Sequence, residues 1–198
     1  MFVGIQILIP LKRLAGAKQR LHPALGGDER RRLMLAMVEH VAREAVAADV
    51  GPVALASCEP LAPALARTYR VGLVSDGELP WNEGLDHARG LISPVPEAVL
   101  YLAGDLPLVS ASDVRALVAA MPERGIAIGR AHDGGTNALA VQPADVITPA
   151  FGSAGSARVH AQLAASAGIE SVTLDRPGLA LDVDTPDDVL RAKLSLTA

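Results

Sequence analysis

The fold follows from the stretch Ile7-Leu8-Ile9-Pro10-Leu11-Lys12-Arg13-Leu14-Ala15-Gly16-Ala17-Lys18-Gln19-Arg20-Leu21, in which a short apolar run is followed directly by a loop with four basic side chains. Such a run is typical of a buried strand in a parallel sheet. Ligands of open α/β sheets bind outside the carboxyl ends of the strands. A cationic loop at that edge is therefore a candidate site for a polyanion such as a nucleoside triphosphate, although a solvated basic loop explains these residues alone at least as well.

The bulk composition is that of a globular protein, with 198 residues of which 50% are hydrophobic and 20% charged. The net charge of -4 argues against nucleic-acid binding, which usually requires a basic surplus. A single cysteine excludes an internal disulfide and a cysteine-rich metal site. The length fits one domain over residues 1–198. Because the sequence shows neither a signal-peptide pattern nor an apolar run of transmembrane length, we expect the protein to be located in the cytoplasm and not on a membrane.

Strand-like and helix-like segments alternate along the chain, which predicts a three-layer α/β sandwich around a mostly parallel mixed sheet. The predicted strands cover residues 7–9, 53–56, 71–74, 98–103, 126–128, 138–141, 172–174 and 179–183. The predicted helices are one that Asp28 caps and that continues to Ala45, those over 63–67 and 82–91, one from the capping box of Ser110 and Asp113 to Ala120, one carrying His160, and one after Thr185.

Three conspicuous features have an ordinary structural interpretation. The arginine run 30–32 fits the solvent-facing side of the first helix. Trp81 fits hydrophobic packing at the entrance of a helix, with stacking on a base as the less favoured alternative. His160 fits a capping or surface histidine better than a catalytic one.

Carboxylates supply the candidate metal site. Asp105 follows the most apolar predicted strand, where it could bind Mg²⁺, although alone it is as readily a turn or capping residue. Asp182 and Asp184 are two apart in a predicted strand, so both side chains point to one face. Two like charges this close are costly unless a cation neutralises them. Asp187 and Asp188 instead suit the positive end of the last helix and are excluded from the site.

Two glycine-rich turns, residues 134–137 and 152–156, have backbone N–H groups that suit a phosphate or carboxylate, although a plain turn is the commoner outcome for either alone. The sequence has no Walker, GxGxxG, GxSxG or HExxH motif, which disfavours P-loop chemistry, glycine-fingerprint dinucleotide binding, serine hydrolysis and zinc proteolysis. Basic loop, carboxylates and donor-rich turns together indicate metal-assisted attack on a nucleoside triphosphate.

The loop from Pro10 to Leu21 is followed in order by Asp105-Leu106-Pro107, Gly134-Gly135-Thr136-Asn137-Ala138-Leu139, Phe151-Gly152, Gly155-Ser156, His160 and Leu181-Asp182-Val183-Asp184-Thr185-Pro186. This series resembles the guanylyltransferases of coenzyme F-420 biosynthesis, which act on 2-phospho-L-lactate, phosphoenolpyruvate or 3-phospho-D-glycerate. The resemblance spans nearly the whole chain. It has two departures, an extra residue between Phe151-Gly152 and Gly155-Ser156, and Pro80-Trp81-Asn82 in place of Gly-Leu-Asn.

The resemblance implies a MobA-like, Rossmann-like nucleotidyltransferase fold and transfer of GMP from GTP to one of these phosphorylated three-carbon acids, with release of pyrophosphate. It implies that Lys18 and the three acids are catalytic, and it assigns the remaining roles as follows: GTP to Lys12, Lys18, Arg20 and Asn82, Mg²⁺ to Asp105, Asp182 and Asp184, and the acceptor to Thr136, Gly152 and Ser156.

Several alternatives stay open. They are the identity of the acceptor, the choice between Ser153 and Ser156, and a homodimer. Two further functions also stay open: a molybdopterin or sugar-phosphate nucleotidyltransferase of the same fold, and a non-catalytic nucleotide-binding relative.

Overall fold

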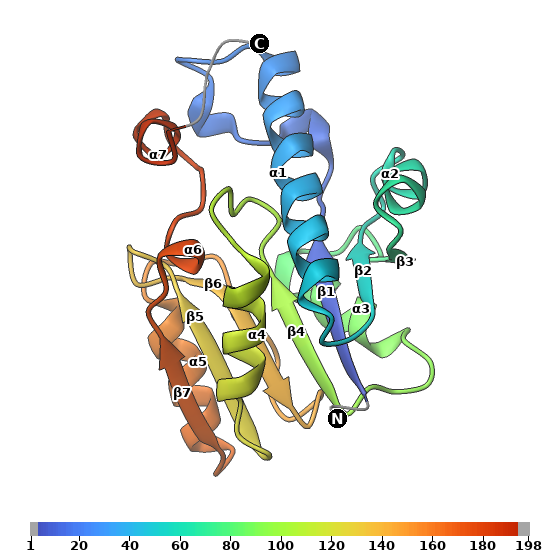
Figure 1. Ribbon diagram of the computed structural model, residues 1–198, viewed down its shortest axis with the longest axis vertical. Helices are drawn as coiled ribbons and strands as arrows, with labels where there is room; N and C mark the ends of the chain where they lie inside the picture. The colour runs from blue at the N-terminus through green and yellow to red at the C-terminus, as the bar shows by residue number, and fades with distance from the viewer. Residues whose placement is uncertain (1–3, 194–198) are drawn as a thin grey trace.

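A seven-stranded sheet forms the centre of the computed structural model, which describes residues 4–193 (Figure 1). The strands are β1 (Ile5–Pro10), β2 (Val53–Ala56), β3 (Gly72–Val74), β4 (Ala98–Leu102), β5 (Gly125–Arg130), β6 (Thr136–Gln142) and β7 (Glu170–Leu174). Their order in the sheet is β3-β2-β1-β4-β6-β5-β7, and β6 alone runs antiparallel to its neighbours β4 and β5.

Helices cover both faces of the sheet (Figure 1). They are α1 (Gly27–Ala48), α2 (Ala62–Tyr69), α3 (Trp81–Gly90), α4 (Ala111–Ala120), α5 (Ser156–Ser166), α6 (Pro177–Ala180) and α7 (Pro186–Arg191), with 3-10 turns at Leu14–Gly16 and Gln19–Leu21. The alternating side chains of β1 explain the layers, because Ile7 and Ile9 pack with α1, α2 and α4 whereas Leu8 packs with α3 and α5. The predicted three-layer α/β sandwich with a mostly parallel mixed sheet is confirmed.

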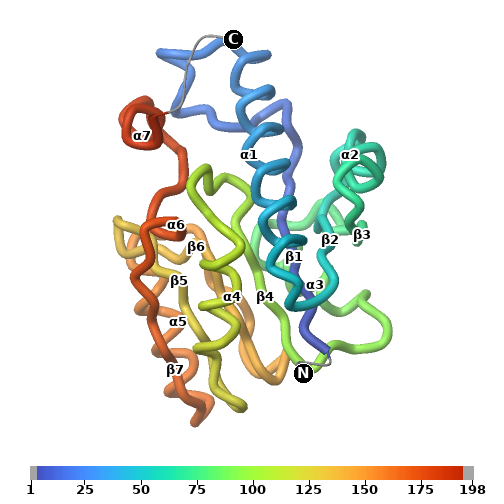
Figure 2. Tube along the Cα trace, in the orientation of Figure 1, coloured from blue at the N-terminus to red at the C-terminus, as the bar shows by residue number. Residues whose placement is uncertain are grey.

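The first loop and α7 lie at the same end of the molecule (Figure 2), where a smaller apolar cluster joins them. The cluster contains Leu21 and Leu25 of the first loop and Met37 of α1. They pack against Val183, which precedes α7, and Val189, which lies within it. The basic loop and the segment before α7 are therefore held next to each other, although more than 150 residues separate them in sequence.

The predicted strand at 179–183 is wrong. The apolar run is buried, with Leu179 and Val183 both at 0% exposure, but Leu179 lies in the one-turn helix α6 and the residues after it form no strand. The edge strand beside β5 is β7. The segment at 179–183 is held by a different contact, in which the Val183 N–H donates to the carbonyl of Asp105 over 3.2 Å. Hydrophobic periodicity does not distinguish such a buried connection from a strand.

Two predictions at α1 are also wrong. The helix is capped by Gly26 rather than Asp28, and the Glu29 carboxylate accepts from the Gly26 N–H over 2.7 Å. Arg30 is 9% exposed rather than on the solvent side, since its guanidinium donates to the carbonyls of Ala17 and Leu25. By contrast, the capping box of Ser110 and Asp113 forms as predicted, and α7 begins after Thr185 as predicted, with Thr185 as its N-cap. None of the helices within residues 4–193 combines the length and apolar character needed to cross a membrane.

Candidate active site

A cleft of about 440 Å³ lies at the carboxyl ends of β1 and β4. Eight predicted site residues line it, namely Lys12, Lys18, Arg20, Asp105, Thr136, Gly152, Asp182 and Asp184. The other two, Asn82 and Ser156, are not among the lining residues. The sheet thus brings the first basic loop, the loop after β4 and the segment between α6 and α7 to one place.

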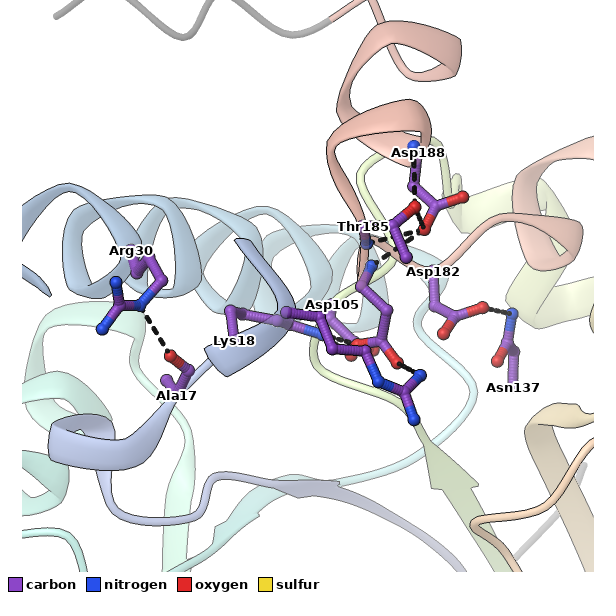
Figure 3. A network of polar contacts seen from close by, with 10 residues as sticks. Ala17, Lys18, Arg30, Asp105, Asn137, Asp182, Thr185 and Asp188 are labelled. Carbon is purple, nitrogen blue, oxygen red and sulfur yellow. Dashed lines mark hydrogen bonds and ion pairs between the residues drawn. The ribbon is translucent and has the colours of Figure 1, made fainter. Parts of the chain in front are cut away.

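The three predicted metal ligands meet in this cleft. One carboxylate oxygen from each of Asp105, Asp182 and Asp184 lies within 4.8 Å of the others. Asp105 follows β4, whereas the other two belong to the irregular segment between α6 and α7, so strand alternation is not what brings them together. The Asn137 side chain holds this segment by donating to Asp182 Oδ1 over 3.2 Å and to the Leu179 carbonyl over 2.9 Å (Figure 3).

Lys18 lies between two of these acids (Figure 3). Its ammonium donates to Asp105 Oδ2 and, over 2.8 Å, to Asp184 Oδ1, while its side chain is only 8% exposed. Burial alone lowers the pKa of Lys18, but the negative charges of Asp105 and Asp184 outweigh it and raise that pKa above the ordinary 10.5. Lys18 is therefore a fixed cation. The backbone of Lys18 is left-handed, with φ at 53°. The buried Arg30 donates to the carbonyl of the preceding residue, Ala17, and so helps to hold this part of the loop.

Asp182 has a different environment from its two neighbours, because no ion pair reaches it among the described residues. Burial and the negative charge of Asp105 raise the pKa of Asp182, while the Asn137 amide opposes this rise. Arg20 lies at the mouth of the cleft, 76% exposed, with its guanidinium 3.4 Å from Asp184 Oδ2. The acid cluster thus carries one buried and one solvent-facing cation.

Lys12 lies on the other side of the cleft, where Asp76 and Leu79 fix it. Its ammonium donates to Asp76 Oδ2 and, over 2.8 Å, to the Leu79 carbonyl. Gly84 of α3 permits this approach, since a Cβ there would lie 3.0 Å from Lys12 Nζ and 3.1 Å from the Asp76 carbonyl. Burial alone raises the pKa of Asp76, but hydrogen bonds led by that of Lys12 lower it overall. Our sequence reasoning missed Asp76, although the rule that identified Asp105, an acid directly after a predicted strand, would have found it.

Trp81 and Asn82 begin α3, next to the cleft. Trp81 lines the cleft and is 38% exposed, so part of its ring is open to stacking. The Asn82 amide instead binds the backbone of Phe151, accepting from its N–H over 2.8 Å and donating to its carbonyl over 3.1 Å. Asn82 therefore supports the turn that carries Gly152 into the cleft.

The three residues that the resemblance assigns to the acceptor are Thr136, at the start of β6, Gly152 and Ser156. Gly152 lines the cleft with φ at +101°, and the space around it is open. Ser156 is only 1% exposed, and its hydroxyl donates to Thr136 Oγ1 over 3.1 Å. His160 is fully buried rather than capping or on the surface, with Nδ1 3.0 Å from Thr136 Oγ1. Ser156 and His160 thus stand behind Thr136.

Several solved structures share this fold. A nucleotidyl transferase from Methanothermobacter thermautotroptrophicus aligns with a TM-score of 0.66 at 17% identity, covering 95% of both chains. A CMP:2-keto-3-deoxy-manno-octonic acid synthetase complexed with CTP aligns at 0.65 and 17%, covering 96% of this chain and 99% of the other. Glucosyl-3-phosphoglycerate synthase from Mycobacterium tuberculosis, solved with Mn²⁺ and UDP, aligns at 0.61 and 14%, covering 95% and 75%. The expected nucleotidyltransferase-like fold is confirmed.

Sequence comparison is more specific. A phosphoenolpyruvate guanylyltransferase from Sphaerobacter thermophilus is 42% identical over 186 residues, which are 92% of this chain and 89% of the relative. Another from Chloroflexus aggregans is 37% identical over 187 residues, covering 91% and 92%. The family model described as "Guanylyl transferase CofC like" matches residues 5–194. The chain therefore belongs to the CofC-like guanylyl transferase family of coenzyme F-420 biosynthesis and is an enzyme that transfers a nucleotide.

Proposed function

We propose that this enzyme transfers GMP from GTP to a small phosphorylated three-carbon acid and releases pyrophosphate. Phosphoenolpyruvate is the first candidate acceptor because the relatives bear its name, and 3-phospho-D-glycerate and 2-phospho-L-lactate are the others. The observation that carries the proposal is the position of Lys18 between Asp105 and Asp184, which makes the basic loop and the acidic trio two parts of one cleft.

The charges of the cleft suit a triphosphate. Lys12, Lys18 and Arg20 all come from the loop after β1 and line the same space. Lys18 and Lys12 are anchored by carboxylates, whereas Arg20 is largely in solvent and free to follow a bound anion. Fixed cations of this kind stabilise the negative charge that develops on a departing pyrophosphate without reorganising during the reaction.

The proposed reaction is an in-line displacement. A phosphate oxygen of the acceptor attacks the α-phosphorus of GTP, forming a new P–O bond, while the bond from that phosphorus to the bridging oxygen of the β-phosphate breaks. Because a phosphate is already ionised at neutral pH, the step needs no general base. The chain's own contribution is alignment of the two anions and neutralisation of their charge.

The acidic trio fits a divalent ion. Mg²⁺ prefers oxygen ligands at about 2.0–2.1 Å in octahedral geometry. Three carboxylate oxygens within 4.8 Å of one another need only small side-chain movements to share one ion. Bound there by Asp105, Asp182 and Asp184, Mg²⁺ would neutralise the phosphate oxygens next to the reacting phosphorus. One structural neighbour, the glucosyl-3-phosphoglycerate synthase, was solved with a divalent ion, Mn²⁺.

The test is to incubate the protein with GTP, Mg²⁺ and each acid separately, and to identify the adduct by mass and the pyrophosphate by a coupled assay. We expect one acid to give a diphosphate-linked guanosine adduct. Asp182→Asn and Asp184→Asn should each lower turnover roughly 100-fold or more, the scale of one well-placed electrostatic contact. Asp187→Asn is the matched control, since this exposed acid of α7 lies outside the cleft.

Two outcomes would contradict the proposal. GTP binding without pyrophosphate release, with any of the three acids, would indicate a non-catalytic nucleotide-binding relative. Turnover only with a molybdopterin or sugar phosphate would indicate another nucleotidyltransferase of this fold.

A further inference from the structure

We propose that His160 acts as a positioning residue that forces the Thr136 hydroxyl to donate its proton into the cleft, which makes the acceptor side specific for an anionic oxygen such as that of a carboxylate or phosphate. This inference rests on the proposed function and deepens it. The resemblance places Thr136 at the acceptor but gives no role to the histidine behind it.

The tautomer of His160 follows from its two neighbours. The backbone N–H of Ala150 donates to His160 Nε2 over 2.8 Å, so Nε2 has no proton. Burial, partly offset by a backbone hydrogen bond with Ser156, lowers the pKa of His160 to about 4, so the ring is neutral at pH 7. A neutral imidazole without a proton on Nε2 has its proton on Nδ1. Nδ1 therefore donates to Thr136 Oγ1, 3.0 Å away.

With both lone pairs of its oxygen in use, the Thr136 hydroxyl can act towards the cleft only as a hydrogen-bond donor. A hydroxyl oxygen has two lone pairs and one proton. His160 Nδ1–H uses one lone pair and the Ser156 hydroxyl, 3.1 Å away, uses the other. Among residues 4–193, Thr136 Oγ1 makes no other hydrogen bond, and the residue is 8% exposed where it lines the cleft. Its proton is directed at whatever occupies the cleft, and an anionic oxygen is the partner that gains most from it.

The same histidine also holds the neighbouring turn. Its ring packs edge-to-face on Phe151, with ring centroids 5.2 Å apart, next to the Ala150 N–H that it accepts. A purely structural histidine would need the Ala150 bond and the Phe151 contact, but not the hydrogen bond from Nδ1–H to Thr136 Oγ1. A variant that keeps only one of the two ring-nitrogen contacts therefore distinguishes a positioning histidine from a purely structural one.

Two substitutions at His160 test each nitrogen separately. In His160→Asn the amide NH₂ can replace Nδ1–H as donor to Thr136 but cannot reach Ala150, whereas in His160→Gln the amide oxygen can replace Nε2 as acceptor from Ala150 but no donor to Thr136 remains. We expect His160→Gln to raise the KM for the acid about 10-fold to 100-fold, the effect of losing one hydrogen bond to a charged group. His160→Asn should raise the KM for the acid much less than His160→Gln does, because it keeps the donor to Thr136 and loses only the Ala150 bond and the Phe151 contact, and the KM for GTP should change in neither.

Variants of Thr136 provide a second route if the histidine variants fold poorly. Thr136→Val should raise the acid KM as His160→Gln does, Thr136→Ser should not, and Thr136→Val with His160→Gln should be no worse than either alone because the two act through one hydroxyl. Nitrogen-15 NMR of the free protein at pH 7 should show Nδ1 of His160 protonated and Nε2 bare. The reverse tautomer overturns the inference outright.

The outcomes separate this inference from the proposed function. Turnover with equal impairment of the Asn and Gln variants, or an equal rise in the KM for GTP, overturns the inference and leaves the reaction standing. Calorimetric binding of an acid that weakens much more in His160→Gln than in His160→Asn, without any adduct formed by the wild type, supports the inference and overturns the reaction. A wild type that binds none of the three acids overturns both.

Discussion

Replacing Lys18 by glutamine should tighten the binding of a divalent metal to the nucleotide-free enzyme while it weakens the use of GTP. The Lys18 ammonium donates to oxygens of Asp105 and Asp184, two of the three carboxylates that would ligate the ion. Ammonium and metal ion compete for the negative charge of the same two carboxylates. A metal ion at the trio of the free wild-type enzyme is therefore opposed by the positive charge of Lys18.

The size of the effect follows from the two bonds and their exposure. Each hydrogen bond between charged groups contributes about 1.5–3 kcal/mol net, and the burial of the ammonium opposes them. The raised pKa of Lys18 shows that the bonds outweigh burial, and the 43% exposure of Asp184 weakens the second bond. A remaining advantage on the scale of one bond, about 1.5 kcal/mol, predicts roughly 10-fold tighter metal binding in Lys18→Gln.

Calorimetric titration of the nucleotide-free protein with Mg²⁺ and with Mn²⁺ measures this effect. Lys12→Gln is the matched control, because it removes the same charge from the same loop but its ammonium is bound by Asp76 and the Leu79 carbonyl, outside the trio. Metal affinity should be unchanged in Lys12→Gln, and the KM for GTP should rise in both variants. Unchanged or weaker metal binding in Lys18→Gln would refute the competition.

Three further predictions concern other parts of the molecule. Trp81→Ala should raise the KM for GTP about 10-fold, since stacking on one base contributes ~1–3 kcal/mol, whereas Trp81→Phe should keep most of the affinity. A change in the KM for the acid alone would place Trp81 beside the acid instead of the base and contradict this prediction. Asp113→Asn should lower the free energy of unfolding by about 1–3 kcal/mol in urea titrations, because this buried carboxylate accepts from the Ser110 N–H, the Ser110 hydroxyl and Arg176; an unchanged midpoint would contradict this. Acid should destabilise the wild type, because burial alone raises the pKa of Asp113 and of Asp188 but their hydrogen bonds lower both below the ordinary 3.8 in the folded state. That stabilisation is complete above about pH 4 and is lost as pH falls through the folded-state pKa, so Asp113→Asn should flatten the loss seen by circular dichroism between about pH 4 and 2.

The sequence predicts the sheet well because its inner strands are continuous apolar runs bounded by turns. The run at 98–102 and its following Asp105 are where periodicity and the edge rule place them. The same reasoning fails at 179–183, where Leu179 is buried in the cluster on the α1 and α4 face of the sheet and Val183 in the smaller cluster with the first loop, and neither is buried by strand pairing. Asp182 and Asp184 still converge, because Asn137 and Val183 tie their segment to the middle of the sheet.

Residues that support the site are harder to predict than those that line it. Arg30 lies in a run of three arginines and only its partners, the Ala17 and Leu25 carbonyls, distinguish it from the exposed pair beside it. Asn137 and His160 act on segments 20 to 45 residues away through single hydrogen bonds. No local pattern encodes such contacts, since each depends on a partner brought close by the complete fold.

The reversed direction of β6 would allow the two proposed substrates to be recognised by separate parts of the chain. Parallel strands bring only their carboxyl ends to the reactive edge, but β6 contributes its amino end, so Thr136 and Asn137 begin a strand where Asp105 follows one. The Asn137 carbonyl and the Ala103 N–H, 2.9 Å apart, join the two directions. As a result, the connections on either side of β6, where the proposed acid-binding residues lie, could change without altering the proposed GTP-binding loop after β1.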